Sequence, residues 1–350
     1  MATPSSTTST PQPPPTPLIA CVGKPSAGKS SLLNSLVAQN VAKTGNYPFT
    51  TIDPNQGVAY ARFPCPCKKF DVVANCKPRY GTCEGGERLL PVRILDVAGL
   101  VPGAHEGKGL GNKFLDDLRT ADCLVHVVDV SGTTDEGGKE TLGYDPINDI
   151  DWLQSEIREW IWGNLSGKWS GVVRRHVSSK TSAAEGLLGM WSGYGADLKV
   201  VQGTLGRLSK KLAVENSGIE STDPHGTSSS VPTTLSGNFQ VDHLETWTDP
   251  DLRIAVDCFL DERFPTVIAL NKIDLATPDT DKNIDRICRR YGQDSIVLTS
   301  ALAEFFLRKL DKQKFIKYKE GDDFFETSET APELGLAPLD DKTRNRLNNV

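Results

Sequence analysis

Several short apolar runs occur along the chain, and each is followed by a polar motif that often contains glycine. Runs of this length, rich in Val and Ile, are typical of strands buried on both faces of a parallel sheet. Ligands of open α/β sheets bind at the carboxyl ends of the strands, where these motifs fall. The pattern therefore predicts an α/β fold with one site at the edge of a parallel-type sheet. The runs cover residues 18–22, 92–95, 124–128, 266–270 and 296–298.

A long insertion separates the third of these runs from the fourth, and its apolar positions have helical spacing. Residues 217–240 are rich in Ser, Thr, Gly and Pro, which predicts a mobile loop, and residues 251–264 again read as a helix. We therefore expect a helical subdomain over residues 146–264 inside a core formed by 18–145 and 265–305, with a C-terminal extension at 306–350. The helical spacing at its start is carried by Ile147, Ile150, Leu153, Ile157, Trp160 and Ile161.

Composition narrows the class of protein further. The chain of 350 residues is 38% hydrophobic and 24% charged, with a net charge of −6, which gives no support for broad nucleic-acid binding. No apolar run approaches the roughly 20 residues that span a bilayer, so we expect neither a membrane-spanning segment nor a membrane as a partner. Residues 1–17 consist almost entirely of Ser, Thr and Pro and predict a disordered tail, not a secretory or mitochondrial signal. We expect a cytoplasmic protein with reduced cysteines.

The first motif has the form of a phosphate-binding loop, in which four residues separate Gly23 from Gly28 and Lys29 and Ser30 follow. Its glycines let backbone N–H groups wrap phosphates at a helix N-terminus. Lys29 would reach the β- and γ-phosphates, and the Ser30 hydroxyl would bind Mg²⁺. The predicted nucleotide contacts in this loop are Gly23, Lys24, Pro25, Ser26, Ala27, Gly28, Lys29, Ser30 and Ser31.

Base recognition is predicted at the last two motifs. In the string NKID, Asp274 can accept hydrogen bonds from guanine N1 and N2, which adenine lacks, while Asn271 and the stem of Lys272 complete the contact. Ser300 and Ala301, in the string TSA, would supply backbone donors to guanine O6. Alone, the tetrapeptide NKID would indicate only a turn. Because it follows the phosphate loop and precedes TSA, it indicates a guanine-binding site.

Two further segments would sense the γ-phosphate. Asp96 would hold Mg²⁺ through water, and the Gly99 amide would contact the γ-phosphate, both within DVAG. Thr51 is the predicted Mg²⁺-sensing threonine, with Thr50 as the alternative. The predicted Mg²⁺ residues are thus Ser30, Thr51 and Asp96, and the predicted catalytic residues are Lys29, Thr51 and Gly99.

Four cysteines lie in the loop at residues 64–90, between the two segments that would sense the γ-phosphate. Four thiolates satisfy tetrahedral Zn²⁺, but the C-x-C spacing is not the common C-x₂₋₄-C, so free thiols remain the alternative. The four are Cys65, Cys67, Cys76 and Cys83.

With these motifs assembled, the chain resembles the Obg/YchF branch of the translation-factor-related P-loop GTPases, and most closely its fungal and archaeal YchF-related group. The resemblance rests on NYPFTTIDPNQGV, DVAGLVPGAHEGKGLGNKFLDDLRTAD and VHVVDVSG, and covers most of residues 18–165 and 251–335. It implies a slow GTPase that binds GTP and GDP, has a ribosome or RNA partner, and depends on an unknown activator. YchF itself resembles an ATPase with an altered base motif, whereas NKID here is intact and favours GTP.

Several departures qualify that implication. Leu100 replaces the water-orienting Gln of Ras-like enzymes, so hydrolysis would be slow or assisted, with His105 and His126 as candidate replacements. Ser26 stands where the family often has the Asn tied to potassium. The resemblance leads us to expect a C-terminal TGS domain, for which we find no matching stretch among the residues up to Val350, and a truncation before that domain stays open. The alternative functions are a nucleotide-binding regulatory scaffold with little hydrolysis and a YchF-like ATPase. Two stretches at 286–290 and 307–320 are rich in basic residues. We interpret them as solvated helix faces in preference to RNA contacts.

Overall fold

Strands β1 to β7 form one mixed sheet in the computed structural model, which describes residues 15–37, 56–97, 99, 103, 111–216, 234–275, 277 and 279–347. The order is β2-β4-β1-β5-β6-β7, with β3 paired to β4. β1 lies parallel to β4 and β5, and β6 lies parallel to β5 and β7, whereas β2 and β3 run antiparallel to β4. The predicted α/β fold with a mostly parallel sheet is thereby confirmed. The strands are β1 (Leu18–Val22), β2 (Gln56–Pro64), β3 (Thr82–Glu84), β4 (Glu87–Asp96), β5 (Cys123–Asp129), β6 (Thr266–Asn271) and β7 (Ile296–Leu298).

The central strand β1 is apolar on both faces because both are covered. Leu18, Ala20 and Val22 enter one core cluster, whereas Cys21 enters another with Leu32 and Leu33 of α1 (Lys29–Val37). Helix α10 (Ala301–Lys312) packs beside α1, and α9 (Thr280–Tyr291) covers β6. The loops at the carboxyl ends of β1, β5 and β6 therefore meet at one edge of the sheet.

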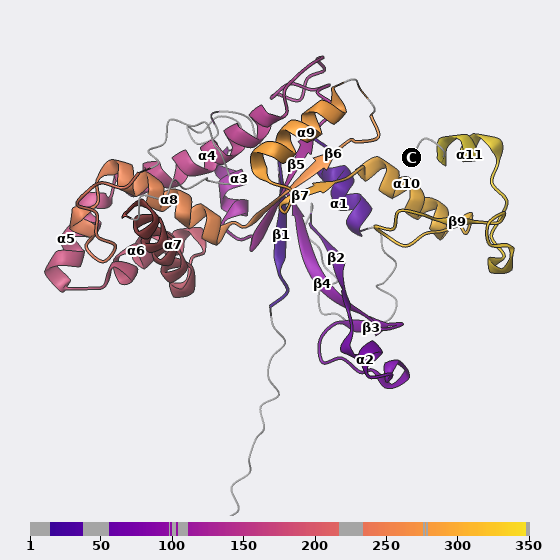
Figure 1. Cartoon of the computed structure of the whole chain (residues 1–350), viewed down its shortest axis with the longest axis horizontal. Coiled ribbons are helices and arrows are strands. Elements are labelled where there is room, and N and C mark those ends of the chain that lie inside the picture. Colours follow the sequence, from indigo (N-terminus) through magenta and orange to yellow (C-terminus); the bar gives the residue numbers. More distant parts are fainter. Residues whose placement is uncertain are drawn as a thin grey trace, which may run out of the picture.

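A group of helices extends from one side of the sheet (Figure 1). Its apolar stripes join β1 and β4 in a single core cluster, so the group does not form a separate core. The Arg263 guanidinium donates to the carbonyls of Ala121 at 2.7 Å, Arg119 at 2.7 Å and Tyr194 at 2.8 Å, which ties the end of α8 to the start of β5. The helices are α4 (Ile147–Ser166), α5 (Trp169–Ser179), α6 (Ala183–Trp191), α7 (Leu198–Asn216) and α8 (Asp249–Arg263).

The remaining elements are short. The C-terminal ones lie on the side of the sheet opposite the helical group and have a small core of Leu310, Ile316, Tyr318 and Leu347 (Figure 1). Among the described residues, no helix combines the length and hydropathy needed to cross a membrane. The short elements are α2 (Pro66–Lys69), η2 (Val73–Asn75), α3 (Gly111–Leu118), η4 (Ser192–Tyr194), η5 (Leu244–Thr246), β8 (Ile316–Lys317), β9 (Glu326–Thr327), η6 (Pro332–Leu334) and α11 (Asp341–Leu347).

Helices α4 to α8 make up most of the described part of the predicted insertion, and the exact domain boundaries stay predictions. Most of the predicted N-terminal tail (1–14) and residues 217–233 of the predicted mobile loop lie outside the described residues. The described end of that loop packs inward, because Leu235 and Phe239 are buried in the large core cluster. The Trp247 indole N–H fixes this end by donating to the Gln240 carbonyl at 2.9 Å.

Candidate functional site

The phosphate-loop sequence forms a tight turn between β1 and α1. Gly23 and Gly28 have φ angles of 144° and 100°, which L side chains rarely adopt. A Cβ at Gly23 would lie 2.4 Å from the Val127 carbonyl oxygen, and one at Gly28 would lie 2.2 Å from the Asn271 side-chain nitrogen. Glycine is therefore required at both positions. Ser26 is left-handed, with a φ of 63°, a conformation that asparagine tolerates better than serine.

Lys29 lies inside this turn. Its Nζ donates to the carbonyls of Gly23 at 3.0 Å and Lys24 at 2.8 Å. Burial lowers the pKa of the Lys29 ammonium, and the carboxylate of Asp96 opposes that shift. A buried cation held by carbonyls at a helix N-terminus is suited to binding a phosphate.

Two of the three predicted Mg²⁺ residues are brought into contact. The Ser30 hydroxyl donates to Asp96 Oδ2 at 2.5 Å, so the end of β4 meets the start of α1. A hydroxyl and a carboxylate beside a lysine are the oxygen donors that Mg²⁺ uses with phosphates. The residues present therefore fit a Mg²⁺ ion.

The base-recognition string is locked to the phosphate loop by one amide. Asn271 Nδ2 donates to the Ala27 carbonyl at 2.9 Å, while its Oδ1 accepts from the Ala301 amide at 3.0 Å. Asn271 is 2% exposed, so this bridge is shielded from water. The predicted contact of the Ala301 amide with guanine O6 would have to share or replace this hydrogen bond.

Asp274 and Ser300 also come together. The Ser300 hydroxyl donates to Asp274 Oδ1 at 2.5 Å and accepts from the Ala303 amide at 3.0 Å, which caps α10. The serine thus orients the carboxylate predicted to read the base. The role given to Ser300 from the sequence was a backbone contact, and its side-chain role is a finding of the structure.

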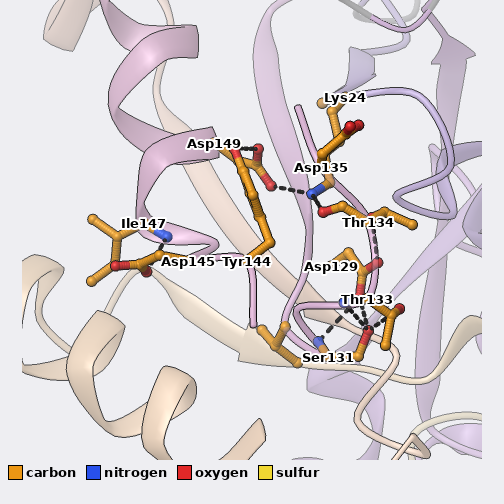
Figure 2. Close-up of polar contacts among 12 residues, drawn as sticks. Lys24, Asp129, Ser131, Thr133, Thr134, Asp135, Tyr144, Asp145, Ile147 and Asp149 are labelled. Carbon is orange, nitrogen blue, oxygen red and sulfur yellow. Dashed lines mark hydrogen bonds and ion pairs between the residues drawn. The ribbon is translucent and has the colours of Figure 1, made fainter. Parts of the chain in front are cut away.

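Asp129, at the end of β5, is a residue that the motifs did not predict. It is fully buried and accepts from the Ser131 amide and hydroxyl and from the Thr134 hydroxyl at 2.8 Å (Figure 2). It also accepts from Lys272 Nζ at 2.7 Å. Burial alone would raise the pKa of Asp129, but these donors outweigh it and lower the pKa. Asp129 therefore positions the lysine of NKID. Its place directly after the apolar run 124–128 was the available signal.

Lys24 points away from the phosphate-binding interior of the loop. Its ammonium lies 2.9 Å from Asp149 Oδ2 in the first turn of α4, and both side chains are 1% exposed (Figure 2). It also donates to the Thr134 carbonyl at 2.7 Å and sits 4.2 Å from the centre of the Tyr144 ring. The Tyr144 hydroxyl donates to the other Asp149 oxygen at 2.9 Å. This network joins the phosphate loop to the helical group.

His126 lies in β5 with its ring 1% exposed. Burial, with the nearby Lys29 charge, lowers the pKa of its imidazole to about 3, so the ring is neutral at physiological pH. Its Cδ2 faces Gly23, which places the ring beneath the phosphate loop. The catalytic role proposed for His126 stays a hypothesis.

Some of the other predicted site residues lie within the described part of the chain, and others lie outside it. Gly99 lies against the phosphate loop, since a Cβ there would be 3.0 Å from the Pro25 nitrogen. Thr51, its alternative Thr50, His105 and Leu100 lie outside the described residues. Of the basic stretch at 286–290, Arg286 pairs with Asp145 at 2.5 Å and Arg290 with Asp151 at 2.8 Å, so these charges are engaged within the chain.

The four loop cysteines form a second centre. Their sulfur atoms all lie within 4.8 Å of one another, an arrangement that could hold a metal ion. The cluster sits at the far end of β2 and β4, because Pro64 pairs with Glu87 there while Gln56 pairs with Leu95 beside the phosphate loop. About 25 Å of extended strand separates the two ends.

Comparison with known proteins identifies relatives over nearly the whole chain. Residues 18–160 match the family model of the 50S ribosome-binding GTPase, and residues 269–350 match that of the Obg-like GTPase YGR210-like, G4 motif-containing domain. A GTP-binding protein of Schizosaccharomyces pombe is 47% identical over 94% of this chain and 73% of its own length. A GTP-binding protein of Methanocaldococcus jannaschii is 39% identical over 87% and 68%.

Other matches cover a smaller part of the chain or have a lower sequence identity to it. The ribosome-binding ATPase YchF of Haemophilus influenzae is 41% identical over 39% of this chain and 34% of its own length. The crystal structure of a GTP-binding protein from Pyrococcus horikoshii superposes with a TM-score of 0.60 at 30% identity, over 86% of this chain and 69% of that one. The resemblance inferred from the motifs is confirmed: the chain belongs to the Obg-like, YchF-type family of P-loop GTPases.

Proposed function

We propose that the protein binds guanine nucleotides with Mg²⁺ and slowly hydrolyses GTP to GDP and phosphate as a molecular switch. The observation that carries this proposal is the Asn271 bridge, which joins the phosphate loop to both base-recognition strings through hydrogen bonds of 2.9 and 3.0 Å. A site assembled in this way holds phosphate and base at a fixed spacing. The names of the fungal and archaeal relatives as GTP-binding proteins support it.

Hydrolysis in such a site is an in-line attack by water on the γ-phosphorus. The new P–O bond forms as the bond to the β,γ-bridging oxygen breaks, GDP leaves with the electron pair, and a proton of the attacking water passes to a phosphate oxygen or to solvent. Lys29 and the backbone amides of the phosphate loop would stabilise the negative charge on the phosphate oxygens. Mg²⁺, when bound through Ser30 and Asp96, supplies further positive charge to the β- and γ-phosphates. We assign only Mg²⁺ to this site, because the clustered thiols lie at the other end of β2 and β4.

Guanine selectivity is the sharpest consequence. Asp274, held by the Ser300 hydroxyl, presents a carboxylate that pairs with guanine N1–H and N2–H₂ but finds no such donor pair on adenine. Equilibrium titration with fluorescent GDP, GTP and ATP analogues in Mg²⁺ should therefore show preference for the guanine nucleotides. Equal or tighter binding of the ATP analogue would assign the protein to the ATPase alternative, which the name of the YchF relatives motivates.

The variant Asp274→Asn tests the residue itself. We expect GTP affinity to fall by on the order of 100-fold, since two hydrogen bonds to a charged group are lost, and xanthosine nucleotides to bind better than GTP. Asp279→Asn is the matched control, because this half-exposed aspartate lies five residues along the chain and its carboxylate pairs with Lys282. Unchanged GTP preference in Asp274→Asn would refute the assignment of the base site.

The partner is proposed to be the ribosome, in the cytoplasm. The family model of a ribosome-binding GTPase and the ribosome-binding name of the YchF relatives support this. Single-turnover phosphate release with and without ribosomes checks it, and release that stays negligible in both would favour the nucleotide-binding regulatory scaffold.

A further inference from the structure

The loop between β2 and β4 brings four thiols to one point. Cys65 Sγ lies 3.7 Å from Cys76 Sγ, Cys67 Sγ lies 3.5 Å from Cys83 Sγ, and all four sulfurs fall within 4.8 Å. Thiolates about 2.3 Å from a tetrahedral Zn²⁺ stand about 3.8 Å apart. The separations of 3.7 and 3.5 Å are close to those of a closed tetrathiolate site, and they exceed the roughly 2.05 Å of a disulfide.

The placement of the four ligands explains why their C-x-C spacing is workable. Cys65 precedes α2 and Cys67 lies within it, so two neighbouring cysteines face different partners. Cys76 follows η2 and Cys83 lies on β3, and each approaches one member of the C-x-C pair. The pairs therefore cross, and the sulfur atoms converge from four separate backbone positions.

The segment from Pro64 to Gly86 has almost no hydrophobic core. Over these residues, all of which the structure describes, Cys65 and Cys67 are the only buried side chains. Phe70 and Val72 are 68% and 48% exposed. A segment this small cannot be held together by apolar burial, and chains in this situation use disulfides or metals. The sulfur cluster occupies the place of the missing core.

The surroundings also suit a negatively charged centre. The Arg88 guanidinium lies 3.8 Å from Cys65 Sγ and also donates to the Tyr80 carbonyl, so it closes the segment over the cluster. The Cys65 amide donates to the Gly86 carbonyl at 2.8 Å, which joins the start of the segment to its end. Four thiolates with one divalent cation carry a net charge of −2, which Arg88 partly offsets.

We propose that Cys65, Cys67, Cys76 and Cys83 bind one structural Zn²⁺ that holds the segment 64–86 closed at the outer end of β2 and β4. Soft thiolates select zinc over magnesium or calcium, and four protein ligands leave no open position for catalysis. The centre is therefore structural and independent of the nucleotide. Its distance from the phosphate loop means that guanine-nucleotide binding and metal binding can fail separately.

The first test is metal content. The whole chain, purified under reducing conditions without chelator, should contain about one zinc per molecule by mass spectrometry of the metal. Mercurial titration of the thiols should release that zinc in step with the modification of four cysteines. A protein free of metal that exchanges no Zn²⁺ on addition, a protein in which the four cysteines form disulfides, or one that contains iron instead would overturn the proposal.

Substitutions then locate the ion. Cys76→Ser and Cys83→Ser should each lower zinc affinity by at least about 10-fold, and Co²⁺ added to the wild type should give the intense absorption of thiolate-to-cobalt charge transfer. Cys288→Ser, at a partly exposed free cysteine on α9, should keep one zinc. Zinc content that is unchanged in both cluster variants would contradict the site.

A measurement on the wild type covers the case in which the cluster variants do not fold. Chelation of the zinc should increase amide hydrogen exchange in 64–86 at least several-fold while α4 to α8 keep their protection. Equal protection of 64–86 before and after removal of the metal would show that the ion does not hold the segment.

Discussion

At the scale of single residues, Lys24 and Asp149 form a buried ion pair in which both side chains are 1% exposed. Both charges are removed from water, and the pair is sustained by the Thr134 carbonyl, the Tyr144 ring and the Tyr144 hydroxyl. Burial raises the pKa of the Asp149 carboxyl, and the Lys24 ammonium opposes that rise. Such pairs stabilise little over apolar substitutes, but loss of one partner leaves an isolated buried charge.

Asp149→Asn should therefore lower the free energy of unfolding by about 3 kcal/mol, because Lys24 then lacks its counter-charge. Urea unfolding followed by circular dichroism measures this change. Asp145→Asn is the control: its pair with Arg286 is half exposed, so we expect a loss below about 1 kcal/mol. Equal effects of the two substitutions would show that burial does not set the cost.

The Lys24 pair also marks the limit of what the sequence could predict about the site. Residues whose chemistry lies within a short motif, such as Lys29 with Ser30 or Asn271 with Asp274, could be placed by spacing and order alone. Asp149 lies 125 positions from Lys24, and its helical spacing indicates only a face of α4. The Ser300 side chain was likewise unpredictable, because its contact with Asp274 depends on how α10 begins.

At the scale of elements, α8 shows how one side chain can join a helix to a loop. Asp251 and Thr248 form a capping box, and Asp251 also accepts from the Ser236 amide and hydroxyl, each at 2.7 Å. Burial alone would raise the pKa of Asp251, but these hydrogen bonds outweigh it, and the folded pKa lies below its ordinary value. The start of α8 therefore depends on an ionised carboxylate.

The sign of the pH dependence follows from that depressed pKa. The unfolded chain binds the Asp251 proton more readily, so the contribution is present above the ordinary pKa of about 3.9 and is lost as pH falls through the folded value. Asp251→Asn should cost about 1–2 kcal/mol at pH 7 and progressively less below pH 4, in urea unfolding at a series of pH values. Asp249→Asn, an exposed residue in the same turn, should leave the curve unchanged. An Asp251→Asn cost that does not fall with pH would contradict an ionised cap.

The positions of the strands and helices were more predictable than the contacts that loop residues make with them. The apolar runs at 18–22 and 266–270 became β1 and β6, and both faces are covered along β1 and along the second half of β6, which is what a continuous apolar run indicates. By contrast, the packing of Leu235 and Phe239 could not be foreseen from a stretch rich in Ser, Thr and Gly. The composition of a loop predicts that most of its residues are polar and exposed, but it does not predict which of its few apolar residues are buried.

At the scale of the whole molecule, the sheet and the helical group share one core. Leu18, Ala20 and Val22 of β1 belong to the same buried cluster as Trp191 and Phe259 of the helical group. The Lys24 pair and the Arg263 contacts cross the same boundary. Since the boundary is a packed core with buried polar links, we expect the two parts to unfold in one transition.

The tryptophans make this expectation measurable, because all six lie between residues 152 and 247, within the helical group. Mg²⁺ with GDP at 100 times its dissociation constant should stabilise a single cooperative unit by about 2.7 kcal/mol. The urea midpoint seen by tryptophan fluorescence should therefore rise, although the nucleotide binds at the sheet. ADP at the same concentration is the control for a nonspecific effect. If GDP binding is established by direct titration and the tryptophan midpoint still does not move, the helical group unfolds on its own, and the shared core does not couple it to the nucleotide site.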